Sequence, residues 1–176
     1  MSAVTRKPQP APIEGPGGAA SSAGAAVGRQ RVLLATADPV FAALCTRALE
    51  KATPPSLVVA VSPPDLLGAA RQVAHDVLVL DADRQDVAAL KALAGKVLLV
   101  SDAPVVLIAG YLGPGSPGLD VLLASIPAHF VQKPQGSSSL SLADQDGPPF
   151  IAALQATFTA HQARDFGAEP AGGNHG

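Results

Sequence analysis

The chain has 176 residues, of which 48 % are hydrophobic and 15 % charged, and this balance predicts one globular domain with a full core. A net charge of −2 gives no basic field for nucleic acid or an anionic membrane, and no apolar run is long enough to span a bilayer. A single cysteine, Cys45, excludes an internal disulfide and fits a reducing compartment, so we expect a cytoplasmic location.

The two ends of the chain differ from its middle in composition. Residues 1–29 are mostly Ala, Gly, Pro and Ser, with too few large side chains to offset the entropy of ordering, and they predict a disordered arm. Residues 164–176 are predicted to be a flexible tail. The domain is therefore expected to comprise residues 30–163, and Cys45, among apolar helical positions, is expected to be a buried structural thiol.

Five short apolar runs alternate with five helical patterns along this domain. The predicted strands are 31–35, 57–61, 77–80, 104–109 and 130–131. The predicted helices are 39–51, 62–73, 86 to about 97, 119–125 and 150–163. The segment 97–100 is either helical or extended, and loops are predicted at 110–118 and 135–149. This alternation predicts an α/β fold with helices on both faces of a parallel sheet, in the flavodoxin-like strand order 2-1-3-4-5.

A carboxylate ends the third predicted strand, because the run 77–80 is followed by Asp81. Open α/β sheets bind their ligands beyond the carboxyl ends of the strands, where strands 1, 3 and 4 meet in this strand order. The order brings other strand-end residues to the same place, namely Thr36, Asp38, Asp83, Ala109 and Lys133. The candidate site is therefore expected at this edge of the sheet.

Four pieces of the chain, in order, resemble the response-regulator receiver domain (CheY-like superfamily). They are VLLATAD (32–38), DVLVLDAD (76–83), APVVLIAG (103–110) and HFVQKP (129–134). The insertion GSSSLSL (136–142) is similar to a loop in the receiver of chemotaxis protein-glutamate methylesterases, so the resemblance is greatest to this CheB type. It extends over roughly residues 30–162 and implies the flavodoxin-like (βα)5 fold.

The resemblance implies a protein that accepts a phosphoryl group on one aspartate, beside a Mg²⁺ ion held by further carboxylates and a lysine that offsets phosphoryl charge. Asp81 matches the phosphoacceptor. Lys133 with Pro134 matches the lysine motif. Phe130 falls at the aromatic position that repacks on phosphorylation.

Other positions depart from the family's pattern. Thr36 and Ala37 stand where the family has the acidic pair that binds Mg²⁺, and Ala109 stands where strand 4 has a hydroxyl. Arg84-Gln85 replaces the usual Met-Pro after the acceptor. Because Mg²⁺ is held by few protein ligands, losing a carboxylate pair should weaken its binding greatly. We therefore predict a degenerate pocket, a pseudo-receiver.

The carboxylates of the pocket have more than one interpretation. The predicted role of Asp81 is to pair with Lys133 at the end of the sheet, and Asp83 is predicted to be a solvated loop residue. No metal and no cofactor are expected, with Mg²⁺ only if the pocket is active. A weaker alternative is a metal set of Asp38, Asp81 and Asp83.

The function predicted on this basis is that of a stand-alone, non-catalytic signalling protein in a two-component or chemosensory pathway. Its partner would be a histidine kinase, a chemosensory component or an output protein, with no binding to nucleic acid or membrane. The resemblance implies that Phe130, the 110–118 loop and the helix from Phe150 form the face for partners and for a homodimer.

Two alternatives remain open. One is a working response regulator that a histidine kinase phosphorylates on Asp81. The other is a small-ligand or nucleotide-binding α/β domain that uses the strand-end crevice. The segment Gly113–Gly118 matches GxGxxG, but it follows the fourth strand rather than the first, and its two prolines lack the N–H groups that cradle phosphate.

Overall fold

The computed structural model describes residues 29–134, 142 and 147–166, with side chains in the last helix as far as His161. Most of the predicted arm at 1–29 and of the predicted tail at 164–176 lies outside the described residues, as does most of the loop at 135–149. No helix within the described ranges combines the length and the apolar character that crossing a membrane requires.

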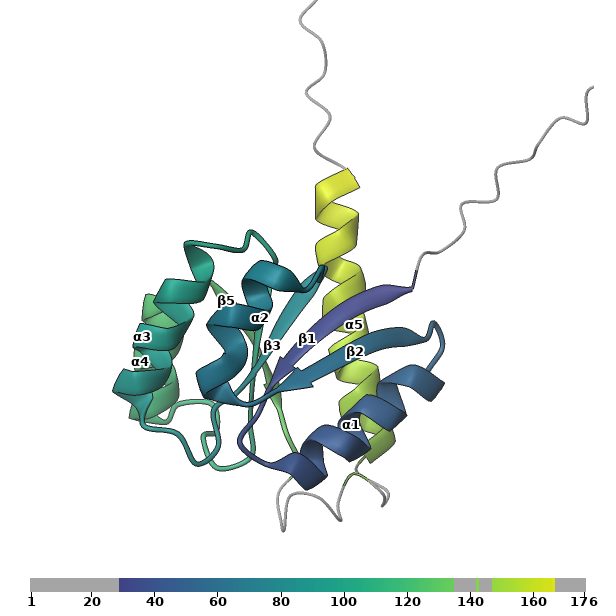
Figure 1. The fold of residues 1–176 in the computed structure, drawn as a ribbon. Coiled ribbons are helices and arrows are strands. Elements are labelled where there is room, and N and C mark those ends of the chain that lie inside the picture. Colours follow the sequence, from purple (N-terminus) through teal and green to yellow (C-terminus); the bar gives the residue numbers. More distant parts are fainter. Residues whose placement is uncertain (1–28, 135–141, 143–146, 167–176) are drawn as a thin grey trace, which may run out of the picture.

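In the described part of the chain, strands and α-helices alternate from end to end (Figure 1). The strands are β1 (Gln30–Ala35), β2 (Ser56–Val61), β3 (Val77–Asp81), β4 (Val105–Ala109) and β5 (Ala128–Gln132). The helices are α1 (Pro39–Lys51), α2 (Leu66–Gln72), α3 (Val87–Leu98), α4 (Pro117–Ser125) and α5 (Gly147–Phe166), with a 3₁₀ turn η1 (Pro63–Asp65) before α2. All strand pairs are parallel, and the order β2-β1-β3-β4-β5 confirms the predicted flavodoxin-like topology.

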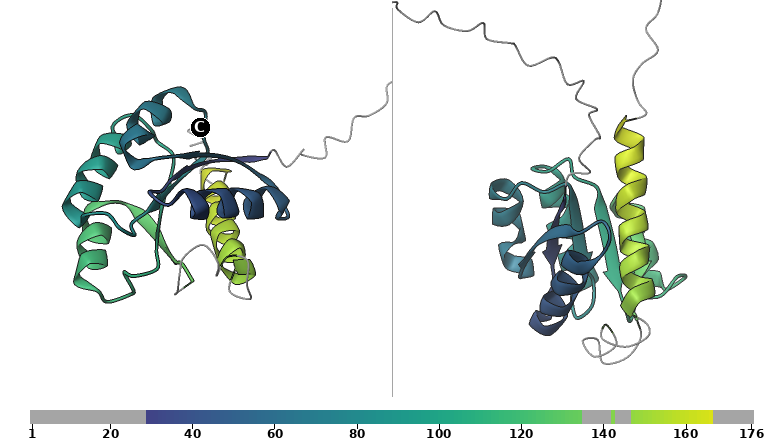
Figure 2. Two further views of the ribbon diagram at one scale, coloured as in Figure 1. Left: turned by 60° about the horizontal axis from the view of Figure 1, so that its bottom comes forward. Right: turned by 90° about the vertical axis from the view of Figure 1, so that its right-hand side faces the viewer.

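The sheet lies between two layers of helices, with α1 and α5 on one face and α2, α3 and α4 on the other (Figures 1 and 2). Side chains alternate along each strand, so neighbouring residues of β1 enter different cores: Leu34 packs towards α1 and α5, and Leu33 towards α2, α3 and α4. Every residue of β3 and β4 is buried. These two strands are therefore the rigid base on which the strand-end residues stand.

Local sequence signals explain where two of the helices begin. The Asp38 side chain accepts hydrogen bonds from the Val40 and Phe41 amides, and Pro39 occupies the first turn of α1, where its missing N–H costs nothing. Asp86 caps α3 by accepting from the Ala89 amide. Both caps lie close after strand ends, so they fix how the chain leaves the candidate site.

Some predicted helix boundaries were wrong, and the alternative left open at 97–100 is resolved. The second helix begins at Leu66 rather than residue 62, because the prolines before it form the turn η1. The segment 97–100 is not extended: α3 ends at Leu98, and the Val100 and Ser101 amides both donate to the Val97 carbonyl, which closes a turn. Helix α5 begins at 147 rather than 150, since proline is tolerated in a first turn, and continues to 166 rather than 163.

Candidate functional site

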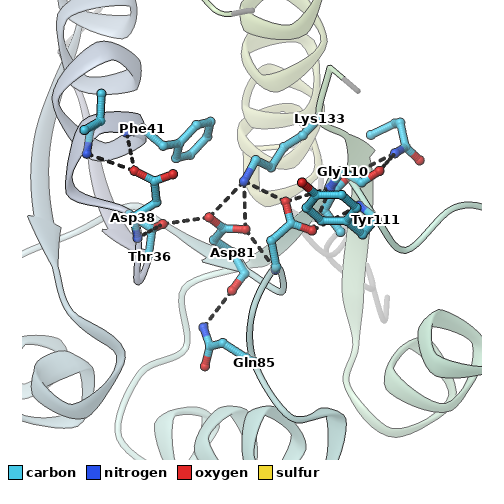
Figure 3. A network of polar contacts seen from close by, with 12 residues as sticks. Thr36, Asp38, Phe41, Asp81, Gln85, Gly110, Tyr111 and Lys133 are labelled. Carbon is cyan, nitrogen blue, oxygen red and sulfur yellow. Dashed lines mark hydrogen bonds and ion pairs between the residues drawn. The ribbon is translucent and has the colours of Figure 1, made fainter. Parts of the chain in front are cut away.

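Three strand ends bring the predicted site residues together at the carboxyl edge of the sheet. Asp81 ends β3 and lies beside Ile108 of β4, whose next residue is paired with Gln132 of β5. Lys133 directly follows Gln132, and Thr36 directly follows β1. Thr36, Asp81, Asp83 and Lys133 are all buried and in contact, and we call these four residues the strand-end cluster (Figure 3).

Lys133 is the centre of the strand-end cluster. Its Nζ atom lies 3.1 Å and 3.0 Å from the two carboxylate oxygens of Asp81 and 2.8 Å from Oδ2 of Asp83. The Lys133 and Asp81 side chains are each only 2 % exposed, and that of Asp83 is 7 % exposed. The ammonium group also lies 4.0 Å from the centroid of the Phe41 ring, whose face attracts a cation. One buried positive charge is therefore shared by two buried carboxylates.

Both carboxylate oxygens of Asp81 accept hydrogen bonds. The Thr36 hydroxyl donates to Oδ2 over 2.6 Å, and the Asp83 amide donates to Oδ1 over 3.1 Å. Gln85 holds the backbone of Asp81, because its Nε2 donates to the Asp81 carbonyl over 2.7 Å. Burial raises the pKa of the Asp81 carboxyl above its ordinary value, although Lys133 and the Thr36 hydroxyl act in the opposite direction.

Asp83 is not the solvated loop residue that the sequence predicted. It is 8 % exposed, and its carboxylate turns towards the loop after β4. The Gly110 amide donates to both of its oxygens over 2.9 Å, and the Tyr111 amide donates to Oδ1 over 3.1 Å. The prediction failed because these partners lie 27 and 28 residues away in sequence, where no local pattern points to them.

The other predicted site residues lie around the strand-end cluster. Asp38 accepts the two α1 amides through Oδ1, and Pro134 follows Lys133. Ala109 is fully buried and contributes its carbonyl, which accepts from the Lys133 amide over 2.8 Å and from Gln132 Nε2 over 3.0 Å. Phe130 is half-buried and packs against the core beneath α2, α3 and α4.

The predicted alternative metal set of Asp38, Asp81 and Asp83 does not form. Within the described ranges, no three His, Cys, Asp or Glu side chains are placed to hold a metal ion. Lys133 bonds to both Asp81 and Asp83, so a cation already occupies the position between these carboxylates. The Thr36 hydroxyl donates a hydrogen bond to Asp81, and Thr36 has no carboxylate to offer a metal. The residues present do not fit Mg²⁺, which prefers oxygen ligands in a near-octahedral arrangement.

The sequence interpretation missed four residues that contact the strand-end cluster: Phe41, Gln85, Gly110 and Tyr111. Gly110 carried a signal, since a glycine directly after a buried strand often permits a close approach. A Cβ on Gly110 would lie 3.2 Å from Oδ2 of Asp83. Phe41 was predictable as a core residue of α1, but its position over an ammonium group was not.

Comparison with known proteins extends this picture. No family model matches the sequence, and no curated protein matches it. Among solved structures, the response regulator domain of Thermotoga maritima CheB superposes with a TM-score of 0.58 at 18 % identity, covering 74 % of this chain and 97 % of that one.

A CheY-like receiver domain protein of Methanospirillum hungatei JF-1 gives a TM-score of 0.55 at 14 % identity, covering 77 % of this chain and 98 % of that one. The signal receiver domain of a putative LuxO repressor protein of Vibrio parahaemolyticus gives a TM-score of 0.55 at 14 % identity, covering 81 % of this chain and 99 % of that one. The fold of the chain is thus that of CheY-like receivers, the CheB receiver among them, which confirms the predicted resemblance at the level of fold.

Proposed function

We propose that this chain is a pseudo-receiver, a cytoplasmic signalling module of a two-component or chemosensory pathway that acts by binding a protein partner. The receiver fold supports the pathway, because the solved structures that it matches include a response regulator domain and two receiver domains. The observation that carries the rest is the sharing of Lys133 between the buried carboxylates of Asp81 and Asp83.

The charge of the strand-end cluster argues against phosphoryl transfer to Asp81. Catalysis of phosphoryl transfer depends on positive charge placed around the transferred group. In this cluster one ammonium faces two carboxylates, so the ionised groups sum to a negative charge that repels an anionic phosphodonor. Both oxygens of Asp81 already accept hydrogen bonds, and the set of side chains does not fit Mg²⁺.

The direct test is intact mass after incubation of the full chain with Mg²⁺ and a small phosphodonor such as acetyl phosphate. The Asp81→Asn variant, which lacks the candidate nucleophile, is the control. We expect no change of mass in either protein. A hydrolysable gain of one phosphoryl group in the wild type, absent from Asp81→Asn, would refute the pseudo-receiver proposal.

The partner is expected to bind over α4 and the loop before it, on the face that the resemblance implies. Two large apolar side chains are exposed there, Tyr111 at 73 % and Val121 at 49 %. Both belong to the segment between β4 and the end of α4, and exposed apolar surface on one segment is a common feature of protein-binding sites. Tyr111 also adjoins the strand-end cluster through its backbone, so the cluster and this surface are physically connected.

This part of the proposal is tested by crosslinking the chain in its own cells and identifying what it captures. We expect a histidine kinase, a chemosensory component or an output protein, and we expect capture to fall with Tyr111→Ser. Leu99→Ser is the matched control, because Leu99 is 85 % exposed but follows α3 rather than lying in the loop before α4. Equal losses in both variants would contradict a surface at Tyr111.

One observation favours a second candidate, the phosphorylatable response regulator. Asp81 and Lys133 are in contact at the ends of β3 and β5, at the positions that match the family's acceptor and lysine. The phosphodonor experiment separates the two candidates, because only the second predicts a mass gain that requires Asp81.

A further inference from the structure

The sheet has two edge strands, and β2 is the one that carries no device against pairing with another strand. It lies at the edge of the sheet with β1 as its neighbour (Figure 1). Native edge strands are protected by charged side chains, prolines or bulges. The sequence SLVVAV of β2 has no charge and no proline, and its register with β1 has no bulge. The opposite edge differs, because β5 carries His129 and Gln132 and is followed closely by Pro134.

The outer side of β2 presents backbone groups that can pair with a further strand. In a parallel ladder, alternate residues of a strand bond to the same neighbour. The Thr36 amide donates to the Val61 carbonyl over 3.1 Å, so Val61 and every second residue before it bond to β1. The N–H and C=O groups of Val58 and Ala60 therefore point away from β1. Within the described ranges, no hydrogen bond reaches these outward groups.

Apolar side chains flank these backbone groups on the face of the sheet that carries α2, α3 and α4. Leu57 is 49 % exposed there. Val59, two residues further on and hence on the same face, is only partly buried against the core beneath these helices. An unprotected edge with exposed apolar side chains is a predicted site of strand association.

On the other face, α1 presents short side chains towards the same edge. Helix α1 packs against β2, and α5 packs against β5. Ala48 and Lys51 lie on the flank of α1 that faces α5, because they line a cavity together with Ile151 of α5. Helical spacing places Ala42 and Thr46 on the opposite flank, at the β2 edge. These short side chains leave room for a second copy of α1 alongside.

We propose that β2 pairs with β2 of a second copy of this chain, antiparallel and about a two-fold axis, so that the two sheets join into one. A two-fold interface requires a surface that complements itself, and a neutral apolar strand does so. With Val58 opposite the partner's Val58, the exposed Leu57 packs beside the partner's Val59, and symmetry repeats this pair. Each copy has one such edge, so the assembly closes at two copies.

The second copy fits this edge better than the parts of the chain outside the described residues. Residues 1–16 have prolines at positions 8, 10, 12 and 16, each of which lacks the N–H that a ladder needs. Residues 17–28 are Gly, Ala and Ser with a single valine, and residues 167–176 are rich in glycine, so both have low strand propensity. A charged strand of another protein would find no opposite charge on β2.

The first test is sedimentation equilibrium of the full chain over a range of micromolar concentrations. One strand pair is a small interface, so we expect a micromolar dissociation constant, with the mass rising from 17.6 kDa towards twice that value. A wild type that stays monomeric throughout this range would overturn the proposal. A mass that rises beyond two copies would overturn it as well, because each chain has one β2 edge.

Two variants place the interface at β2. Leu57→Lys brings like charges together across the two-fold axis, and Ala60→Pro removes an outward N–H that β1 does not use. We expect each to raise the dissociation constant at least about tenfold. The matched control is Leu99→Lys, since Leu99 is 85 % exposed but follows α3, and it should leave the constant unchanged. If Ala60→Pro fails to fold by circular dichroism, Leu57→Lys still decides, because it changes only a half-exposed side chain.

A dimer that Leu57→Lys does not weaken would overturn the proposal. Equal weakening by Leu57→Lys and Leu99→Lys would overturn it too, because the effect would then come from net charge. Tyr111→Ser separates this interface from the partner surface proposed above, which lies over α4 and the loop before it. A dimer that Tyr111→Ser weakens and Leu57→Lys does not would place the contact on that surface.

Disulfide crosslinking tests the antiparallel pairing itself. Chains with Leu57→Cys are mixed with chains with Val59→Cys and oxidised mildly, and the buried Cys45 does not interfere. In the proposed register these two positions are directly opposite each other, with about 5 Å between their Cβ atoms. We expect more crosslinked dimer from the mixture than from either variant alone. Equal yields from the mixture and from the separate variants would overturn the proposed pairing.

Discussion

Replacing Lys133 with methionine removes the ammonium group that two buried carboxylates share. The methionine side chain keeps most of the buried length of the lysine stem, so the substitution removes charge with little loss of packing. The side chains of Asp81 and Asp83 are 2 % and 7 % exposed. Without the lysine, their remaining donors are backbone amides and the Thr36 hydroxyl. The variant therefore isolates the contribution of one buried positive charge.

The size of the effect follows from the burial of the pair. Removing one partner of a buried ion pair costs about 3–5 kcal/mol of unfolding free energy, because the remaining charge is left uncompensated. Here two like charges remain, so the folded variant should bind a proton that the unfolded chain releases near pH 4. Above that pH the unfolding free energy of the variant should fall by about 1.4 kcal/mol per pH unit, and it should do so over a wider pH range than in the wild type, where Lys133 opposes the effect of burial on the pKa of Asp81.

Urea unfolding followed by circular dichroism, repeated over a series of pH values, measures both quantities. Lys91→Met is the control, because Lys91 is exposed on α3 and its loss should change stability by less than about 0.5 kcal/mol. A loss below about 1 kcal/mol in Lys133→Met, without the pH slope, would show that water solvates the two carboxylates and that the reasoning from burial is wrong.

Three further predictions follow from the same contacts. Gly110→Ala should lower the unfolding free energy by about 1–3 kcal/mol in urea titrations, because its Cβ would crowd Oδ2 of Asp83 at 3.2 Å. Burial raises the pKa of Asp81, so the folded chain takes up a proton on this carboxyl at a higher pH than the unfolded chain does. As the pH falls from neutral towards about 4, the unfolding free energy of the wild type should therefore rise relative to that of Asp81→Asn. A difference in unfolding free energy that stays constant with pH would contradict this. Burial raises the pKa of the Cys45 thiol to about 12, so iodoacetamide should label it only after unfolding, as mass spectrometry would show.

The sequence was sufficient for the topology and for part of the site. Alternating strands and helices led to the strand order β2-β1-β3-β4-β5, and that order alone placed Asp81 and Lys133 at the same edge of the sheet. Their pairing was also predicted, although β4 lies between the two strands that carry them. These features depend on connectivity, which a chain of alternating elements determines almost completely.

The orientation of Asp83 could not be predicted in this way. It depends on the backbone at Arg84, whose φ of 60° is not encoded by a glycine or asparagine, and on two amides that follow a different strand. The position of Phe41 over the Lys133 ammonium depends on how α1 packs across the sheet edge. Periodicity predicts which residues are buried, but not which buried groups meet.

The bonds from Gly110 and Tyr111 to Asp83 have a consequence for the kinetics of hydrogen exchange. These amides begin a surface loop, and loop amides usually exchange their protons with solvent through small local fluctuations. Their acceptor, however, is the buried carboxylate of Asp83, two residues after β3, and exposing the amides requires that side chain to leave Lys133 as well. We expect both protons to exchange as slowly as those of β3 and β4, so that the start of the loop opens only when the centre of the sheet opens.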